Sequence, residues 1–195
     1  HDVIDIEWSP NGVHLACTVN RGGEVELALI HTTSGELRPL RNGIGVHSRP
    51  CWSPASDFIS FEFESPLSPP DLCRLHLDSG RVTHLTHAIP PALEALPLVR
   101  PEVISYHSAD GLEIPAFLYQ PKHPNSAGIV HPHGGPSAQY GYDWDGFAQY
   151  LVGKGYTFLA PNYRGSTGYG RAFERLNHNA WGIGDTQDCL HAARY

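Results

Sequence analysis

The chain has 195 residues, of which 41% are hydrophobic and 10% aromatic, as in ordinary globular proteins, and this composition excludes a disordered chain. The formal net charge is −7 with only 13 Lys and Arg residues, which argues against a nucleic-acid partner and against an anionic membrane surface. The sequence also contains no apolar run approaching the roughly 20 residues of a membrane span.

The start of the chain and its cysteines bear on the compartment. The sequence begins at His1, with no signal peptide and no initiator methionine, so we expect that the natural N-terminus is missing. The cysteines are scattered without a C-x-x-C pair, which favours reduced core cysteines in a cytoplasmic protein over a disulfide or a zinc site; they are Cys17, Cys51, Cys73 and Cys189. At this length we expect one domain or pieces of two.

The first hundred residues contain an internal repeat. The tripeptide Trp-Ser-Pro at 8–10 recurs at 52–54, 44 residues later. Short strands are expected after each copy, over 13–19, 25–31 and 37–40 in the first unit and over 58–63, 72–77 and 82–85 in the second. Four short strands at a period of about 40–45 residues are typical of a β-propeller blade. Because a propeller needs about 4–8 blades, these two units are expected to be the last blades of a larger one.

Prolines mark the connections of this region. The segment 65–70 is expected to be a proline-rich loop between two strands of the second blade. Prolines cluster again over 89–101, with a helix-compatible stretch at 92–95, so we place the domain boundary there: 1–98 for the blades and 99–195 for a second domain. After it, strands at 103–106 and 114–119 flank a turn with Asp-Gly at 110–111, which predicts a β-hairpin.

The stretch 128–170 predicts a parallel crossover of strand, turn, helix, strand and turn. The strands are expected at 128–130 and 157–160, and glycine-rich turns follow them. The helix between them has Trp144, Phe147, Ala148, Leu151 and Val152 at helical spacing and is expected to end at Lys154 and Gly155. Ligands gather where such strands end.

A last helix is expected to close the chain. Asp185 is its expected N-cap, and the apolar face is expected to consist of Cys189, Leu190, Ala192 and Ala193.

The first of these turns, His-Gly-Gly-Pro at 133–136, points to a specific chemistry. Pro136 has no N–H, so the donors that can face a ligand belong to Gly134, Gly135 and His133. Consecutive glycines allow the chain to turn its amides into a concavity, and amides held this way form an oxyanion hole. A tight strand-to-helix turn explains the same residues, and the turn alone does not decide between the two.

Other ligands for this region are disfavoured. No phosphate-loop or dinucleotide-binding motif is present, so nucleotide binding is not expected. Two histidine pairs, 131/133 and 84/87, suggest a metal, but no nearby carboxylate or cysteine completes such a site. We therefore expect no cofactor and no metal.

The second half of the sequence resembles a known family. HGGP followed by YDWDGFAQYLVGKGYTFLAPNYRGSTGYG, with Ala-Trp-Gly at 180–182 and Gly-Asp at 184–185, is similar to the prolyl oligopeptidase family of serine peptidases, particularly its acylaminoacyl-peptidase and dipeptidyl-peptidase-like branches. The resemblance implies the N-terminal part of an α/β-hydrolase sheet preceded by the last blades of a β-propeller. It also implies that the hairpin is the antiparallel opening of that sheet.

The resemblance also implies roles for individual residues. The N–H of Gly135 would hold the oxyanion of the reacting acyl group, with Gly134 and His133 in the same turn. Some family members have a tyrosine hydroxyl where this chain has His133, and the histidine favours the branch that relies on backbone amides. Tyr163 lies beyond the second strand and, together with its neighbour Arg164 and with Tyr169, could border the substrate or simply support the loop.

The nucleophile is not found in the sequence. α/β-Hydrolases carry it in G-x-S-x-G, which is absent here. Ser166 lies one glycine out of register in Arg-Gly-Ser-Thr-Gly, and Ser137 lacks the pattern, so neither is expected to attack the substrate. The serine, histidine and carboxylate of the triad are expected after Tyr195, and the chain alone is expected to be inactive.

The expected partners are short peptide substrates, N-acylated or dipeptidyl, that the propeller would select by size. No nucleic acid and no membrane are expected, and a homo-oligomer stays open. Two other functions compete with the peptidase. One is a non-catalytic propeller–hydrolase fragment that serves as a binding or scaffold module. The other is a carboxylesterase, against which the two blades stand because simple esterases lack a propeller.

Overall fold

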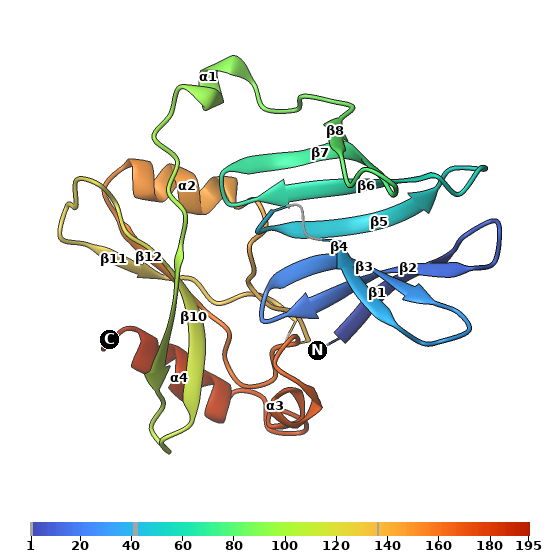
Figure 1. Ribbon diagram of the computed structural model, residues 1–195. Helices are drawn as coiled ribbons and strands as arrows, with labels where there is room; N and C mark the ends of the chain where they lie inside the picture. The colour runs from blue at the N-terminus through green and yellow to red at the C-terminus, as the bar shows by residue number, and fades with distance from the viewer. Residues whose placement is uncertain (1, 41–42, 136) are drawn as a thin grey trace. The chain divides into compact units, whose positions relative to one another are not determined.

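The computed structural model describes residues 2–40, 43–135 and 137–195 (Figure 1). The chain divides into two compact units, His1–Leu96 with Tyr142–Trp144, and Pro97–Gly141 with Asp145–Tyr195. No helix among the described residues is long and apolar enough to cross a membrane.

The first unit consists of two four-stranded antiparallel repeats. Within each repeat every strand pairs with the next one along the chain. Among the described residues, the parallel pair of Val25 with Val46 joins β3 of the first repeat to β5 of the second. The strands of the first repeat are β1 (Asp2–Trp8), β2 (His14–Arg21), β3 (Glu24–His31) and β4 (Leu37–Leu40). Those of the second are β5 (Val46–Trp52), β6 (Phe58–Ser65), β7 (Ser68–His76) and β8 (Val82–His84), and the four-residue helix α1 (Pro91–Glu94) follows them.

The same turn follows the first strand of each repeat. Ser9 Oγ accepts a hydrogen bond from the N–H of His14, and Ser53 Oγ accepts one from the N–H five residues further on. A side-chain link also joins the repeats, because the indole Nε1–H of Trp52 donates to the carbonyl of Glu7 at 3.1 Å. The Trp-Ser-Pro repeat in the sequence therefore corresponds to a repeated structural turn, although β1 and β5, which precede it, were not predicted.

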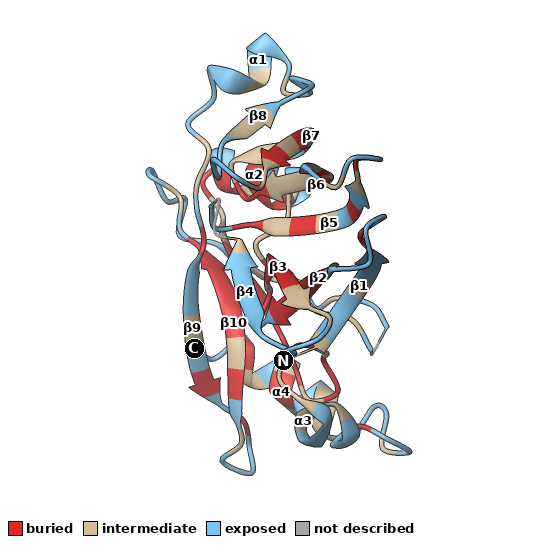
Figure 2. Ribbon diagram, turned by 45° about the vertical axis from the view of Figure 1, so that its right-hand side comes forward, coloured by how far each residue is buried: buried red, intermediate tan, exposed pale blue. Residues whose placement is uncertain are grey.

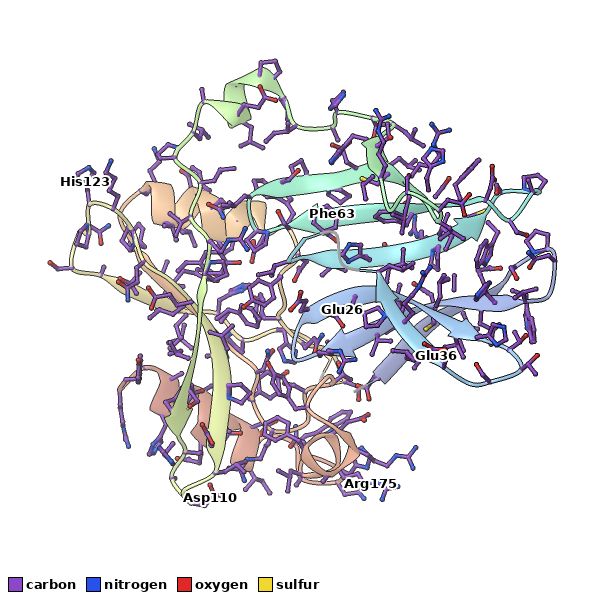
Figure 3. All side chains as sticks on the ribbon, in the orientation of Figure 1. Glu26, Glu36, Phe63, Asp110, His123 and Arg175 are labelled. Carbon is purple, nitrogen blue, oxygen red and sulfur yellow. The ribbon has the colours of Figure 1, made fainter. Side chains whose placement is uncertain are left out.

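His47 is part of the packed interior of this unit. It is 2% exposed, and its Nδ1–H donates to the carbonyl of Val25 at 2.6 Å. Its ring contacts those of Phe61 and Phe63, at centroid distances of 5.5 and 4.7 Å (Phe63 is labelled in Figure 3). Burial lowers the pKa of His47, and the bond to Val25 only partly offsets this effect.

Two expectations for this unit are wrong. The proline-rich segment 65–70 is not a loop, because β6 ends at Ser65 and β7 begins at Ser68. The prolines are tolerated at the start of β7 because its pairing with β6 shifts register beside them. On the other side of β7, β8 pairs only with residues 73–75, so the prolines need not donate to it. The cysteines are not all in the core: Cys17 and Cys73 are buried, Cys189 is half-buried and Cys51 is exposed. All four are free thiols.

The second unit contains a four-stranded mixed sheet. Its strands are β9 (Glu102–His107), β10 (Glu113–Tyr119), β11 (Gly128–Val130) and β12 (Thr157–Pro161), in the order β11-β12-β10-β9. β10 is antiparallel to both β9 and β12, whereas β11 and β12 are parallel. Gly111 makes the β9–β10 turn with a φ of +83°, so the predicted hairpin and the predicted parallel pair are both confirmed.

Helices cover both faces of this sheet. They are α2 (Gly146–Gly153), the short α3 (Arg171–Arg175) and α4 (Gly184–Ala192). Phe158 of β12 contacts Phe147 of α2, and the next residue, Leu159, packs with Ala192 of α4. Successive side chains of a strand point to opposite faces, so α2 and α4 cover opposite faces of the sheet. β10 between them is largely buried (Figure 2).

The buried face of α2 differs from the prediction. The helix begins after Asp145, whose side chain accepts a bond from the N–H of Ala148, so Trp144 lies outside it. Phe147 is 54% exposed, and Gln149 is buried instead. The reason is a polar bond that hydropathy does not reveal: the Gln149 amide group donates to the carbonyl of Val99 and accepts from the Val99 N–H.

The expected N-cap and apolar face of α4 are also wrong. Ile183 is the N-cap residue, and Asp185 lies in the first turn, where its carboxylate accepts from the N–H of Gly182. Leu190 is 50% exposed, whereas Asp188 is fully buried together with Ala192. A buried carboxylate takes the place of an apolar residue because Arg164 and neighbouring donors bind it, as described below.

Candidate active site

The His-Gly-Gly turn begins directly after β11. The N–H of His131 still donates to Leu159 of β12, and the chain then leaves the sheet. Gly135 has a φ of +133°, and a Cβ on it would lie 2.9 Å from the backbone nitrogen of Ser137. Only glycine fits this position without strain. Gly134 is different, because a Cβ there would meet no atom within 4 Å.

The backbone N–H groups of Gly134 and Gly135 are the donors of this turn. Within the part of the chain that the structure describes, neither the N–H of Gly134 nor that of Gly135 has a hydrogen-bond partner. Both glycines are exposed, so a ligand can reach these N–H groups, and amides at a strand end are suited to bind an anion or a developing negative oxygen. Pro136 lies outside the described residues.

His133 is fixed from several directions. Its ring stacks on Tyr163, with centroids 4.4 Å apart and planes 17° apart, and the Tyr163 hydroxyl donates to the His133 carbonyl at 2.8 Å. Nδ1 lies 2.7 Å from the carbonyl oxygen of Gly134 and therefore carries a proton, since a carbonyl only accepts. Burial lowers the pKa of His133, more than the bond to Gly134 raises it.

Ser166 contacts the other nitrogen of this histidine. Its Oγ lies 2.8 Å from His133 Nε2 and donates to the carbonyl of Tyr163 at 2.6 Å. The Ser166 residue is fully buried, so this serine–histidine pair has no open path to a substrate carbonyl. Ser166 therefore holds the His133 ring in place in the turn. The sequence alone did not indicate this contact.

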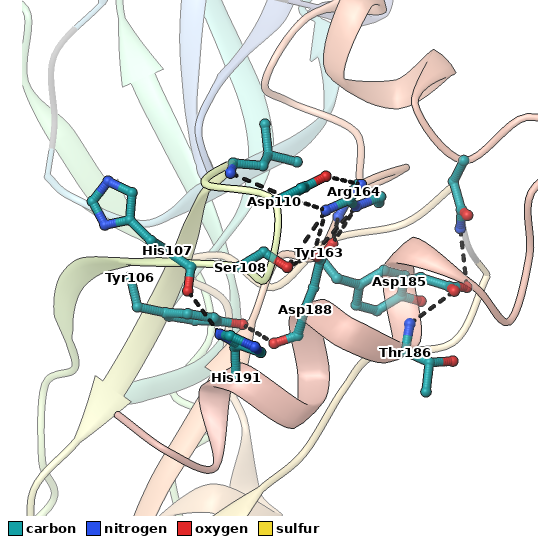
Figure 4. A network of polar contacts seen from close by, with 12 residues as sticks. Tyr106, His107, Ser108, Asp110, Tyr163, Arg164, Asp185, Thr186, Asp188 and His191 are labelled. Atoms are coloured by element: carbon teal, nitrogen blue, oxygen red, sulfur yellow. Dashed lines mark hydrogen bonds and ion pairs between the residues drawn. The ribbon is translucent and has the colours of Figure 1, made fainter.

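Arg164 lies in a network of polar contacts with two carboxylates (Figure 4). Asp188 Oδ2 accepts from the Arg164 backbone N–H and Nε, and Asp188 Oδ1 accepts from Nη2 at 2.8 Å and from Ser108 Oγ at 2.5 Å. Asp110, at the tip of the β9–β10 hairpin, binds Nη1 at 2.8 Å, and this ion pair lowers the pKa of Asp110 to about 2. The network joins the hairpin, the loop after β12 and α4.

Tyr169 and Asn162 form a second polar contact in the same loop. Asn162 is fully buried directly after β12, and its Nδ2 donates to the Tyr169 hydroxyl at 2.7 Å and to the carbonyl of Tyr140 at 2.9 Å. Its Oδ1 accepts from the Tyr140 N–H at 2.6 Å. Nothing in the sequence pointed to this residue, because an asparagine in a glycine-rich turn is ordinary. A role of Tyr163, Arg164 or Tyr169 in substrate binding stays a prediction.

An open depression of about 580 Å³ lies next to the turn. It is lined by Ser137, His178, Asn179 and Trp181, and the Trp181 residue is 68% exposed. Ser137 is the first described residue after Gly135, so the depression borders the end of the turn.

Neither histidine pair lies in a metal cluster. No group of three or more His, Cys, Asp or Glu that could hold a metal ion occurs among the described residues. The rings of His84 and His87 stack with centroids 6.3 Å apart. His131 Nδ1 is bonded to the Tyr140 hydroxyl, and its ring contacts Phe158.

Comparison with known proteins confirms the family resemblance. Residues 130–195 match the model of the prolyl oligopeptidase family. The chain is 30% identical over 132 residues to dipeptidyl aminopeptidase BIII of Pseudoxanthomonas mexicana, covering 63% of this chain and 19% of that protein. It is 27% identical over 178 residues to the human acylamino-acid-releasing enzyme, covering 84% of this chain and 24% of that enzyme.

Solved structures show the same similarity. The acylaminoacyl peptidase of Pyrococcus horikoshii matches with a TM-score of 0.83 and 26% identity, over 99% of this chain and 30% of that one. A puromycin-hydrolyzing peptidase of Mycobacterium tuberculosis matches with a TM-score of 0.86 at 22% identity, over 98% and 30% of the two chains, which bears on the fold alone. The 195 residues thus span a quarter or less of the two curated relatives named above and 30% of these two solved chains.

Proposed function

We propose, with the resemblance to the prolyl oligopeptidase family as the premise, that these residues are part of a serine peptidase that hydrolyses short peptides, N-acylated or dipeptidyl, through an acyl-enzyme. The observation that carries the proposal is the pair of exposed N–H groups of Gly134 and Gly135 at the end of the parallel strand β11, for which the described part of the chain supplies no hydrogen-bond partner. A positive φ that only glycine accepts holds this geometry.

The mechanism assigns these amides to the transition state. A serine hydroxyl attacks the peptide carbonyl carbon, a histidine takes the serine proton, and the carbonyl oxygen becomes an oxyanion. The N–H of Gly135 donates to this oxyanion, and each such donor is worth about 2.7–4 kcal/mol to the transition state. The histidine then protonates the leaving amine, and water releases the acyl group. Serine, histidine and carboxylate belong to the part of the protein after Tyr195.

The sheet supports a nucleophile outside these residues. β11 is an edge strand, and beside it lies an apolar hollow of about 380 Å³ lined by Ile129, Val130 and Ala192 among others. A further parallel strand next to β11 would fill this hollow and end at the same edge as the His-Gly-Gly turn. A serine on the turn after that strand would then face the glycine amides.

The first unit fits the role of a size filter. Its two four-stranded repeats support assignment of 1–98 to the last blades of a β-propeller, and 99–195 to the N-terminal part of an α/β-hydrolase domain. Such a propeller would admit short peptides and exclude folded proteins. In this proposal the protein is cytoplasmic and needs no cofactor.

Labelling with a fluorophosphonate probe tests the proposal. The full-length protein should be labelled in a one-to-one ratio, and residues 1–195 alone should not be labelled. Labelling of the 195-residue chain at Ser137 or Ser166 would overturn the assignment of the nucleophile. Absence of labelling in the full-length protein would favour the scaffold function, and labelling with hydrolysis of simple esters but not of peptides would favour a carboxylesterase.

A further inference from the structure

The His-Gly-Gly turn is anchored on both sides by the loop that follows β12. On the side of His133, the Tyr163 hydroxyl binds the backbone carbonyl and Ser166 contacts the ring. On the other side, Thr167 N–H donates to the carbonyl of Ala138 at 3.0 Å, and Asn162 binds both backbone groups of Tyr140. Between these anchors the two glycine amides have no partner among the described residues.

Asn162 is the most firmly placed of these anchors. It is fully buried, its own N–H donates to the carbonyl of Pro115 in β10 at 2.8 Å, and it directly follows the last residue of β12. Its side-chain amide pairs with the backbone of Tyr140 as a neighbouring strand would, giving one bond and accepting one at 2.9 and 2.6 Å. The backbone at Tyr140, five residues after Gly135, is thereby tied to the sheet.

We propose that Asn162 is a positioning residue of the oxyanion hole: by holding the backbone of Tyr140, it fixes the direction in which the amides of Gly134 and Gly135 point. This inference rests on the proposed function. Oxyanion donors act because they are oriented before the reaction and need no reorganisation during it. Among the described residues no group binds the N–H of either glycine, and the Gly134 carbonyl is held only by the His133 ring at 2.7 Å, so the direction of the amides depends on the anchors at either end.

The exchange N162D preserves shape and changes the two contacts that Asn162 Nδ2 makes, with the Tyr140 carbonyl and with the Tyr169 hydroxyl. A carboxylate can still accept from the Tyr140 N–H, but it cannot donate to the Tyr140 carbonyl and places a second oxygen against it. The turn should shift, and a displacement of about 1 Å can cost about 10²-fold in rate. The loss should fall on kcat, with KM little changed, because the amides act on the transition state rather than on the bound peptide.

The experiment uses the full-length protein with a short peptide substrate and a peptide aldehyde, which forms a tetrahedral adduct. We expect N162D to lower kcat about 10²-fold and to weaken aldehyde binding by a similar factor, with KM within about twofold. The matched control is N125D. Asn125 also binds backbone groups through its side chain, at Ala127 and Lys154, but on the exposed surface, so N125D should leave all three constants unchanged.

Each outcome decides the inference. A folded N162D enzyme with wild-type kcat and aldehyde affinity would overturn it, as would a loss confined to KM. If N162D does not fold, N162S, whose hydroxyl keeps one of the two bonds, should give an intermediate loss in kcat, and a wild-type kcat would again overturn the inference. Failure of the proposed function is distinguishable, because the wild-type protein would then neither cleave the peptide nor bind the aldehyde.

Discussion

The buried carboxylate of Asp188 should be essential for the stability of the second unit. It is fully buried and accepts from three groups of Arg164 and from Ser108 Oγ, at 2.5–2.9 Å. The exchange D188N keeps the volume but replaces one acceptor oxygen with a donor that faces these N–H groups. Hydrogen bonds to charged groups contribute about 1.5–3 kcal/mol each. With about two of them lost, we expect D188N to lower the free energy of unfolding by about 3–5 kcal/mol, the range for a broken buried ion pair.

Native-state hydrogen exchange of the β10 amides measures this change locally. β10 pairs with β9, whose Tyr106 hydroxyl donates to the Asp188 carbonyl, so opening of this sheet reports on the network. D110N is the matched control, because Asp110 binds the same Arg164 guanidinium from an exposed position and should change little. A change in opening free energy below about 1 kcal/mol for D188N would refute the reasoning, since not even one net hydrogen bond would then be lost.

Three further predictions concern other residues. G135A should lower kcat of the full-length peptidase about 10²-fold or more, because the added Cβ clashes at a positive φ. The control G134A should retain activity, and equal losses in the two variants would contradict the geometry of the turn. Because burial lowers the pKa of His47, the unfolded state binds more protons below about pH 6.5, and the first unit should lose stability as the pH falls below that value. In urea titrations H47F should weaken this dependence of unfolding free energy on pH, and an unchanged dependence would show that another group causes it. G184A should destabilise the second unit in thermal unfolding, since a Cβ there would lie 2.6 Å from Arg164, and an unchanged Tm would show that Arg164 moves aside freely.

The features that the sequence predicted well are those with a periodic or local signal. The hairpin around Gly111, the parallel strands at 128–130 and 157–160 and the repeat after Trp52 follow from alternation, turn residues and internal similarity, and all are present. The first strand of each repeat was missed because it lacks such a signal. β1 is largely exposed and β5 contains a register shift, so neither has regular alternation.

The features that were missed depend on polar side chains whose partners are distant in sequence. Asp188 was not expected in the core because its partner Arg164 is 24 residues away, and Gln149 because Val99 is 50 residues away. In the candidate site, the His-Gly-Gly turn could be predicted from its consecutive glycines after a strand, but the support from Asn162 and Ser166 could not. Hydropathy counts such residues as surface, and only the tertiary structure supplies the partners that make their burial favourable.

The bond from the Trp52 indole to the Glu7 carbonyl has a consequence for how such repeats multiply. Both partners of this hydrogen bond lie within the repeated unit. The indole is at the end of the first strand of one repeat, and the carbonyl that accepts from it lies near the end of the first strand of the preceding repeat. A tandem gene duplication of one unit would therefore deliver both the donor for the preceding copy and the acceptor for the following one. Adding repeats by duplication therefore requires no new contact between repeats, only that each copy keeps the tryptophan at the position of Trp52.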